Sequence, residues 1–342
     1  MNIINVEHLY KIYGEKIIFD DASFGIQKGD KIGIVGINGT GKSTLLKMIA
    51  GEETPDKGQI IKQNGLNLAY VPQNPVFSED STIRSYALKK GEENWKVESN
   101  LTELNITRFD QKIEHLSGGQ KKRVVLAKIL SDDFDVLLLD EPTNHLDEAM
   151  IRWLEEYLRS YKGTVIMVTH DRYFLDRVTN RILEISHGKM YGYDSDYSGF
   201  LELKAQREEM ESASERKRQS VLRMELEWAK RGCRARTTKQ RARLERLEQL
   251  KNGNTPIKDQ TVELDSVETR MGKKTIELHH VSKKYGEKVI LDDFSYIVLK
   301  NQRLGIIGPN GCGKSTLMKM IAGQVIPDSG NIEIGETIKI GY

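Results

Sequence analysis

The sequence has few of the features that mark secreted or membrane-spanning proteins. Its 342 residues include only two cysteines, Cys233 and Cys312, which cannot form the disulfide framework of a small secreted domain. The N-terminal residues lack the basic start and apolar core of a secretory signal. The longest apolar stretches, such as 136–139 and 165–168, are far shorter than the roughly 18 residues that span a bilayer. These absences predict a cytoplasmic protein without a membrane anchor.

A large excess of charge of one sign is also absent from the chain as a whole. The formal net charge is only +2, with 38% hydrophobic and 30% charged residues, which is a globular composition. The charge is nevertheless uneven, because residues 201–251 hold fifteen Lys and Arg against nine Asp and Glu. This local excess is compatible with an RNA partner, and equally with a solvated helical hairpin.

An internal repeat organises the chain. Residues 8–70 match residues 280–342 without a gap, and about half of the paired positions are identical. We therefore expect a first domain over residues 1–200, a charged helical linker over 201–271, and the N-terminal part of a second copy over 272–342. The linker lacks proline from 201 to 250 and is expected to form two long helices joined near Gly232, as a hairpin or coiled coil.

Short apolar runs predict an α/β domain. VLLLD at 136–140 and VIMVTH at 165–170 are typical of strands buried in a parallel sheet. A helical stretch over 148–161 separates them, and another helix is expected to start near Lys42.

The segment GINGTGKS at 36–43 matches the phosphate-loop pattern. Its glycines let backbone N–H groups approach phosphate oxygens, Lys42 reaches the β and γ phosphates, and Ser43 offers a hydroxyl to Mg²⁺. An ordinary glycine-rich turn is the alternative, but the second copy, GPNGCGKS at 308–315, makes it untenable.

Two further strand ends carry candidate catalytic groups. Asp140 is placed to hold Mg²⁺, and Glu141 to orient and polarise a water molecule. His170 ends the next apolar run, where it would meet Asp140 if the two strands are neighbours. The alternatives are a polar strand exit that caps a helix and a structural histidine.

LSGGQ at 116–120, between a phosphate loop and VLLLDEP, resembles the signature of ATP-binding-cassette ATPases. The resemblance implies a P-loop NTPase fold with a parallel core sheet, an antiparallel β subdomain and a small helical subdomain. It also implies ATP and Mg²⁺ as cofactors and head-to-tail pairing of two cassettes. In that family Glu141 matches the general base and His170 the switch histidine.

The resemblance extends the expected site to both copies. Tyr13 and Tyr285 match the aromatic residue that stacks on adenine, Gln73 matches the glutamine that contacts Mg²⁺, and Asp147 ends the turn that senses the partner cassette. The expected catalytic residues are Lys42, Glu141 and His170, and the expected metal ligands are Ser43, Gln73, Asp140 and Ser315. The expected nucleotide-binding residues are Tyr13, Gly36, Asn38, Gly39, Thr40, Gly41, Lys42, Ser43, Thr44, Gln73, Ser117, Gly118, Gly119, Gln120, Asp147, Tyr285, Gly308, Asn310, Gly311, Cys312, Gly313, Lys314, Ser315 and Thr316.

Two cassettes in one chain with a charged linker resemble the ABC-F family of translation-associated ATPases, and the linker sequence resembles the Uup-type subgroup. This resemblance implies binding to the ribosome near the tRNA exit site, with contacts to ribosomal and transfer RNA. Residues 230–246 hold eight basic residues and one acid, which would make binding dependent on salt. The expected RNA-contacting residues are Lys230, Arg231, Arg234, Arg236, Lys239, Arg241 and Arg243.

The second cassette is expected to be incomplete, because no second LSGGQ, Asp-Glu pair or switch histidine follows Lys314. We therefore expect ATP binding with slow hydrolysis. The chain is predicted to be an ATPase that regulates translation. The alternatives are the nucleotide-binding subunit of a transporter and a regulatory RNA-binding module in which hydrolysis is vestigial.

Overall fold

The computed structural model describes residues 2–78, 80–88, 94–230, 248, 275–286, 288–308, 311–335 and 337–342. The chain divides into two compact units, one over residues 1–145 and 149–259 and the other over 146–148 and 260–342. The expected boundary at residue 200 falls inside one helix, and the boundary at 271 lies outside the described residues, so both remain predictions.

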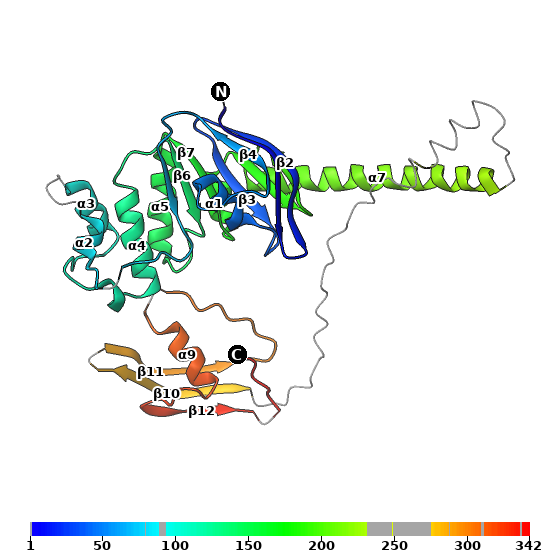
Figure 1. The fold of residues 1–342 in the computed structure, drawn as a ribbon. Helices are drawn as coiled ribbons and strands as arrows, with labels where there is room; N and C mark the ends of the chain where they lie inside the picture. Colours follow the sequence, from blue (N-terminus) through cyan, green and yellow to red (C-terminus); the bar gives the residue numbers. More distant parts are fainter. Residues whose placement is uncertain are drawn as a thin grey trace. The chain divides into compact units, whose positions relative to one another are not determined.

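A six-stranded sheet forms the centre of the first unit, with strand order β5-β6-β7-β3-β8-β9 (Figure 1). All neighbouring strands are parallel except β8 and β9. Every residue of β6 and β7 is buried, as expected for continuous apolar runs covered on both faces. The strands are β3 (Lys31–Gly36), β5 (Leu68–Val71), β6 (Val136–Asp140), β7 (Thr164–Val168), β8 (Arg181–Ser186) and β9 (Lys189–Tyr193).

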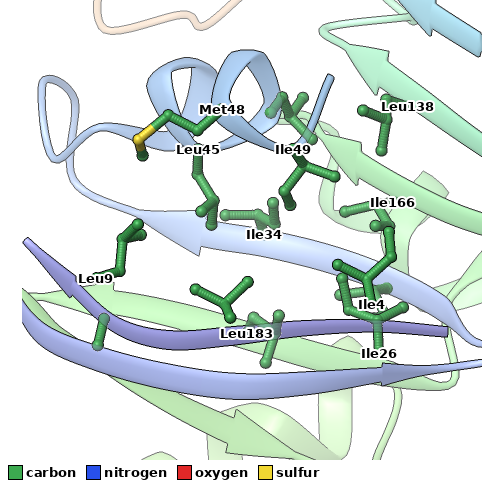
Figure 2. Close-up of a cluster of buried hydrophobic side chains, with 14 of the residues drawn as sticks. Ile4, Leu9, Ile26, Ile34, Leu45, Met48, Ile49, Leu138, Ile166 and Leu183 are labelled. Atoms are coloured by element: carbon green, nitrogen blue, oxygen red, sulfur yellow. The ribbon is translucent and has the colours of Figure 1, made fainter. Parts of the chain in front are cut away.

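A three-stranded antiparallel sheet lies beside this core, in the order β2-β1-β4. Its strands are β1 (Asn2–Tyr13), β2 (Lys16–Gln27) and β4 (Lys57–Lys62). Fully buried side chains of this sheet, such as Ile4 and Ile26, share one apolar cluster with Ile34 of β3 and with Leu45 of the helix after the phosphate loop (Figure 2). The antiparallel subdomain predicted from the resemblance is therefore packed onto the parallel sheet.

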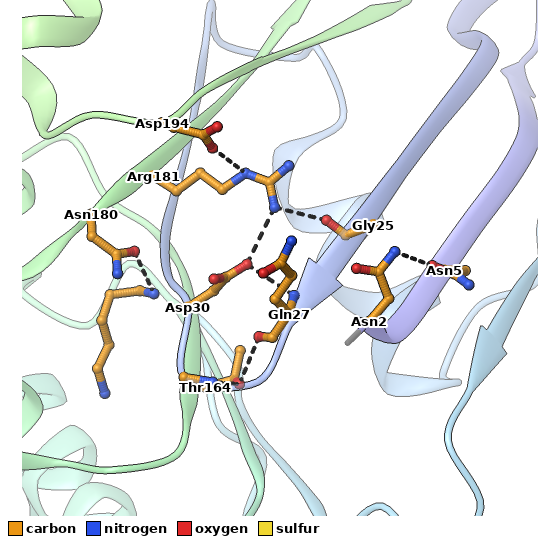
Figure 3. Close-up of polar contacts among 11 residues, drawn as sticks. Asn2, Asn5, Gly25, Gln27, Asp30, Thr164, Asn180, Arg181 and Asp194 are labelled. Atoms are coloured by element: carbon orange, nitrogen blue, oxygen red, sulfur yellow. Dashed lines mark hydrogen bonds and ion pairs between the residues drawn. The ribbon is translucent and has the colours of Figure 1, made fainter.

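A polar contact centred on Arg181 also joins the two sheets. Its guanidinium Nη1 donates to the carbonyl of Gly25 in β2 at 2.8 Å and lies 3.2 Å from the Asp30 carboxylate. Its Nε lies 3.2 Å from Asp194 (Figure 3). The side chain of Arg181 is about one-fifth exposed, so these partners hold its charge with little help from water.

Helices cover the core sheet and form the small helical layer. The expected helix at Lys42 and the expected helical stretch over 148–161 are confirmed as α1 and α5. The helices are α1 (Lys42–Ala50), α2 (Ile83–Ala87), α3 (Trp95–Glu103), the 3-10 helix η1 (Ile113–His115), α4 (Gly118–Ile129), α5 (Glu148–Ser160) and α6 (Arg172–Val178).

A long helix, α7 (Tyr197–Lys230), begins on the core sheet and is the first predicted linker helix. Glu184 of β8 is buried and accepts a hydrogen bond from the Tyr193 hydroxyl at 3.0 Å. Lys204 and Arg207 of α7 form ion pairs with the same carboxylate at 2.7 and 3.0 Å. This contact fixes the first turns of α7 to the sheet. The second predicted linker helix lies outside the described residues, except for residue 248, which is helical.

The second unit repeats the antiparallel sheet, here in the order β11-β10-β12. Its elements are β10 (Ile276–Tyr285), β11 (Lys288–Val298), α9 (Lys314–Ile321) and β12 (Ser329–Ile334). Ile306 is 42% exposed and belongs to no strand, whereas its counterpart Ile34 in β3 is fully buried; Ile307 is 94% exposed, whereas its counterpart Val35 is half-buried. Within the described part of this unit, no strand flanks them as β7 and β8 flank β3.

Across the described ranges, every helix is too short or too polar to pass through a lipid bilayer.

Candidate functional site

The phosphate-loop pattern lies between β3 and α1, as predicted. The Lys42 ammonium donates to the carbonyls of Gly36 at 2.8 Å and Ile37 at 3.1 Å. Burial lowers the pKa of Lys42, while the Glu141 and Asp140 carboxylates raise it. Gly41 has a φ of 97°, and a Cβ there would lie 2.2 Å from Ile18, so only glycine fits this turn.

The rest of the loop is exposed or half-buried above the N-terminus of α1. The Lys16 ammonium donates to the Gly39 carbonyl at 2.8 Å, and the Thr40 hydroxyl donates to Ile37 at 2.9 Å. Asn38 is exposed and Thr44 half-buried. Backbone N–H groups at a helix N-terminus attract anions such as phosphate.

The end of β6 brings a carboxylate to the loop. The Ser43 hydroxyl donates to Asp140 Oδ1 at 3.0 Å. Asp140 is only 2% exposed, and burial raises the pKa of its carboxyl. A hydroxyl and a carboxylate are oxygen ligands of the kind that Mg²⁺ prefers.

Glu141 and His170 meet at the same edge of the sheet. Because β6 and β7 are parallel neighbours, Glu141 Oε1 lies 3.4 Å from His170 Nε2. The Glu141 backbone N–H donates to Val168 at 2.8 Å, and the residue has a φ of 50°, a left-handed conformation that is uncommon outside glycine. The expected meeting of these strand ends is confirmed.

Glu141 also has a buried oxygen without a hydrogen-bond partner. It is 5% exposed, its Oε2 has no hydrogen-bond partner among the described residues, and burial raises the pKa of its carboxyl. A buried acceptor without a partner is costly, and a water molecule held next to a phosphate would satisfy it. The donor set of Lys42, Ser43, Asp140 and Glu141 therefore fits ATP with Mg²⁺.

The LSGGQ segment starts α4. Ser117 caps this helix: its hydroxyl accepts from the Gln120 N–H, and the Gln120 side chain accepts from the Ser117 N–H, the reciprocal capping box. Gly118 faces open space, whereas a Cβ on Gly119 would lie 2.5 Å from the His145 carbonyl oxygen. The segment thus presents small residues and a helix N-terminus.

The remaining predicted residues lie around this core or away from it. Tyr13, at the end of β1, is 47% exposed, and its hydroxyl donates to Glu53. Gln73 is exposed in the turn after β5, and Asp147 directly precedes α5. For these three residues the structure gives positions and not roles.

The second copy repeats the loop geometry. The Lys314 ammonium donates to the Gly308 carbonyl at 2.6 Å, and Gly313 has a φ of 108° before α9. Tyr285 ends β10 and is 52% exposed. Gly311, Cys312, Ser315 and Thr316 are exposed or half-buried at this loop, and Asn310 lies outside the described residues.

The RNA-contacting residues remain a prediction. Lys230 is the last residue of α7, and Arg231, Arg234, Arg236, Lys239, Arg241 and Arg243 lie outside the described residues.

Sequence reasoning missed two polar contacts beside the site. Lys122 of α4 is 2% exposed and contacts the Asp140 carbonyl at 3.0 Å. The hydroxyls of Thr143 and Thr169 share a buried hydrogen bond of 2.8 Å between the segments that carry Glu141 and His170. The only signal for Lys122 in the sequence was its place two residues after LSGGQ.

Comparisons with known proteins agree with this geometry. A family model described as ABC transporter matches residues 19–144 and 291–340, and a second model with the same description matches residues 183–264. A solved structure of the ATP-binding subunit of an ABC transporter matches with a TM-score of 0.51 at 24% identity, over 56% of this chain and 90% of its own. That likeness shows the P-loop ABC ATPase fold.

Curated relatives match over almost the whole chain. An uncharacterized ABC transporter ATP-binding protein of Bacillus subtilis is 42% identical over all of this chain and 61% of its own length. The energy-dependent translational throttle protein EttA is 38% identical in Haemophilus influenzae and 36% in Mycobacterium tuberculosis, over 94% and 99% of this chain and 66% and 69% of their own lengths. The chain therefore spans about two thirds of the relatives it matches.

Proposed function

The chain belongs to the ABC family of ATP-binding proteins, and from this premise we propose that it hydrolyses ATP and acts on the ribosome, in the cytoplasm, to regulate translation. Its finer placement, as an ABC-F protein near the Uup type, is part of this proposal. The relatives named as translational throttles support it, because their similarity extends through the basic linker.

The geometry of the first cassette supports hydrolysis. Lys42 supplies positive charge at the phosphate loop, and Ser43 and Asp140 are placed to hold Mg²⁺. When bound, ATP would supply the γ phosphoryl group that is transferred to water with ADP as the leaving group, and Mg²⁺ would neutralise the charge that develops on the phosphate oxygens. Glu141 would orient a water molecule and accept its proton, and His170, whose Nε2 lies 3.4 Å from the Glu141 carboxylate, would help to hold that carboxylate in place.

The role in translation needs a surface for RNA. Eight basic residues between 230 and 246 would neutralise several phosphates and release counterions, so binding would weaken steeply with salt. If two cassettes close head to tail when ATP binds and open after hydrolysis, RNA binding by the basic linker would depend on the nucleotide that is bound.

Sedimentation with ribosomes tests the proposal. We expect Glu141→Gln to bind ribosomes in the presence of ATP and to lose them as salt increases, with the exposed Glu156→Gln of α5 behaving like the parent chain. Replacement of Arg234, Arg236 and Lys239 by Gln should weaken the association and flatten its dependence on salt. No association at low salt, with ATP binding intact, would overturn the role in translation.

A second candidate is the nucleotide-binding subunit of a transporter. The name of the Bacillus subtilis relative favours it, as does the likeness to a transporter's ATP-binding subunit. Absence of ribosome binding together with capture of a membrane partner would support this candidate.

A further inference from the structure

A buried lysine joins three parts of the first cassette. The ammonium of Lys122, in the first turns of α4, donates to the carbonyls of Pro72 at 3.2 Å, Gln73 at 3.4 Å and Asp140 at 3.0 Å. Pro72 and Gln73 form the turn after β5, and Asp140 ends β6. One side chain therefore links the LSGGQ helix, the turn that carries Gln73 and the strand end that carries both carboxylates.

The charge of Lys122 is held almost without water. The residue is 2% exposed, and burial lowers its pKa to about 8, against the opposing effect of Asp140 and Glu141. Burying an ammonium group to this extent without polar partners would cost a large amount of free energy. Three carbonyl oxygens take the place of water around the Lys122 ammonium, and the charges of Asp140 and Glu141 favour it from nearby. The positions of the ammonium and of these three carbonyls therefore depend on one another.

The neighbouring basic residues of α4 do not share this arrangement. Arg123 donates from Nη1 to the Leu104 carbonyl at 3.4 Å, at the end of α3. Lys121 is only half-buried. In the basic run 121–123, Lys122 is thus the residue directed at the strand ends.

We propose that Lys122 is a positioning residue: it holds the turn of Gln73 and the end of β6 in the arrangement that accepts Mg–ATP, and it ties the LSGGQ helix to that arrangement. This inference rests on the proposed nucleotide site. Because the carbonyl of Gln73 is held at Lys122, loss of the ammonium frees the turn, and the metal loses an ordered ligand set.

The test is the gain in ATP affinity that Mg²⁺ provides, measured by titration with and without EDTA. Lys122→Met should reduce this gain about tenfold while the affinity without metal changes less than twofold. Lys122→Arg, which keeps a cation, should recover most of the gain, and Lys121→Met should match the parent chain. Thermal unfolding of each variant reports whether the fold is retained.

Three outcomes would overturn the inference. They are an unchanged gain in Lys122→Met, an equal loss of affinity with and without Mg²⁺, and a Lys122→Arg variant as defective as Lys122→Met. This test measures nucleotide binding. If the chain binds Mg–ATP but does not bind ribosomes, the role in translation is overturned and the inference about Lys122 is not.

Discussion

The hydroxyl of Ser43 donates to the carboxylate of Asp140 at 3.0 Å, which joins the start of α1 to the end of β6. Ser43 follows β3 and Asp140 is the last residue of β6, and β7 lies between these two strands. The contact places the two proposed Mg²⁺ ligands next to each other.

Ser43→Ala should weaken binding of Mg–ATP roughly ten- to hundredfold, because it removes the hydroxyl proposed to bind Mg²⁺, and an interaction with a charged group contributes on the order of 1.5 to 3 kcal/mol. Isothermal titration measures the change. Ser160→Ala, whose hydroxyl contacts only the end of its own helix, is the matched control. Equal affinities for the two variants would contradict the assignment of Ser43.

Glu141→Gln should stabilise the nucleotide-free chain at pH 7. Because burial raises the pKa of the Glu141 carboxyl above its ordinary 4.5, the folded chain keeps the proton to higher pH than the unfolded chain does. Its ionisation therefore costs stability as pH rises through this window. Glutamine removes this cost, so we expect Glu141→Gln to be more stable than the parent chain at pH 7, and this gain to disappear below pH 4.5.

Urea unfolding of the parent and variant at several pH values measures this gain. Glu156→Gln, at an exposed position of α5, should show no such trend. A gain that is constant with pH would show that titration of Glu141 is not its cause.

Gly119→Ala should destabilise the first unit by about 1 to 3 kcal/mol, because the new methyl group meets the His145 carbonyl oxygen at 2.5 Å. Gly118→Ala, one residue away, faces open space and should be neutral or slightly stabilising. Chemical unfolding compares the two. If both behave alike, the close approach of α4 to His145 is not present in solution.

Glu184→Ala should loosen the start of α7. The change leaves Lys204 and Arg207 without their shared buried carboxylate, at a cost of about 2 to 3 kcal/mol. Hydrogen exchange of the first turns of α7 should accelerate. Glu208→Ala, which removes only an exposed partner of Lys204 at 3.7 Å, should change stability by less than about 0.5 kcal/mol; similar exchange in both variants would refute the anchor.

The carboxyl ends of β6 and β7 could be placed from the sequence, because parallel strands end at the same edge of a sheet. Asp140 and His170 each come at the end of an apolar run, so placing them at one edge of the sheet required only that β6 and β7 be neighbours, as they are; the contact itself is between Glu141 and His170. The phosphate loop was equally predictable, since its glycines satisfy a local backbone requirement.

Lys122 and Glu184 could not be assigned in this way. Lys122 lies in a run of three basic residues, and which of them faces the sheet depends on where α4 begins and how it packs. Glu184 interrupts the apolar strand β8, but its cationic partners stand 20 and 23 residues later on a helix rich in such groups. Tertiary contacts between distant elements decide both cases, and the pattern of a single segment carries no information about them.

The ion pairs of Glu184 with Lys204 and Arg207 hold one end of α7 on the sheet, so a small rotation there produces a large displacement at the other end. Glu184 pairs with Val35, the residue before the phosphate loop, and the 34 residues of α7 extend for about 50 Å at 1.5 Å per residue. A rotation of about 5° at its root would move the far end by about 4 Å, close to the spacing of stacked bases. Movements at the phosphate loop too small to alter the sheet would thus be amplified at the distant end of the helix.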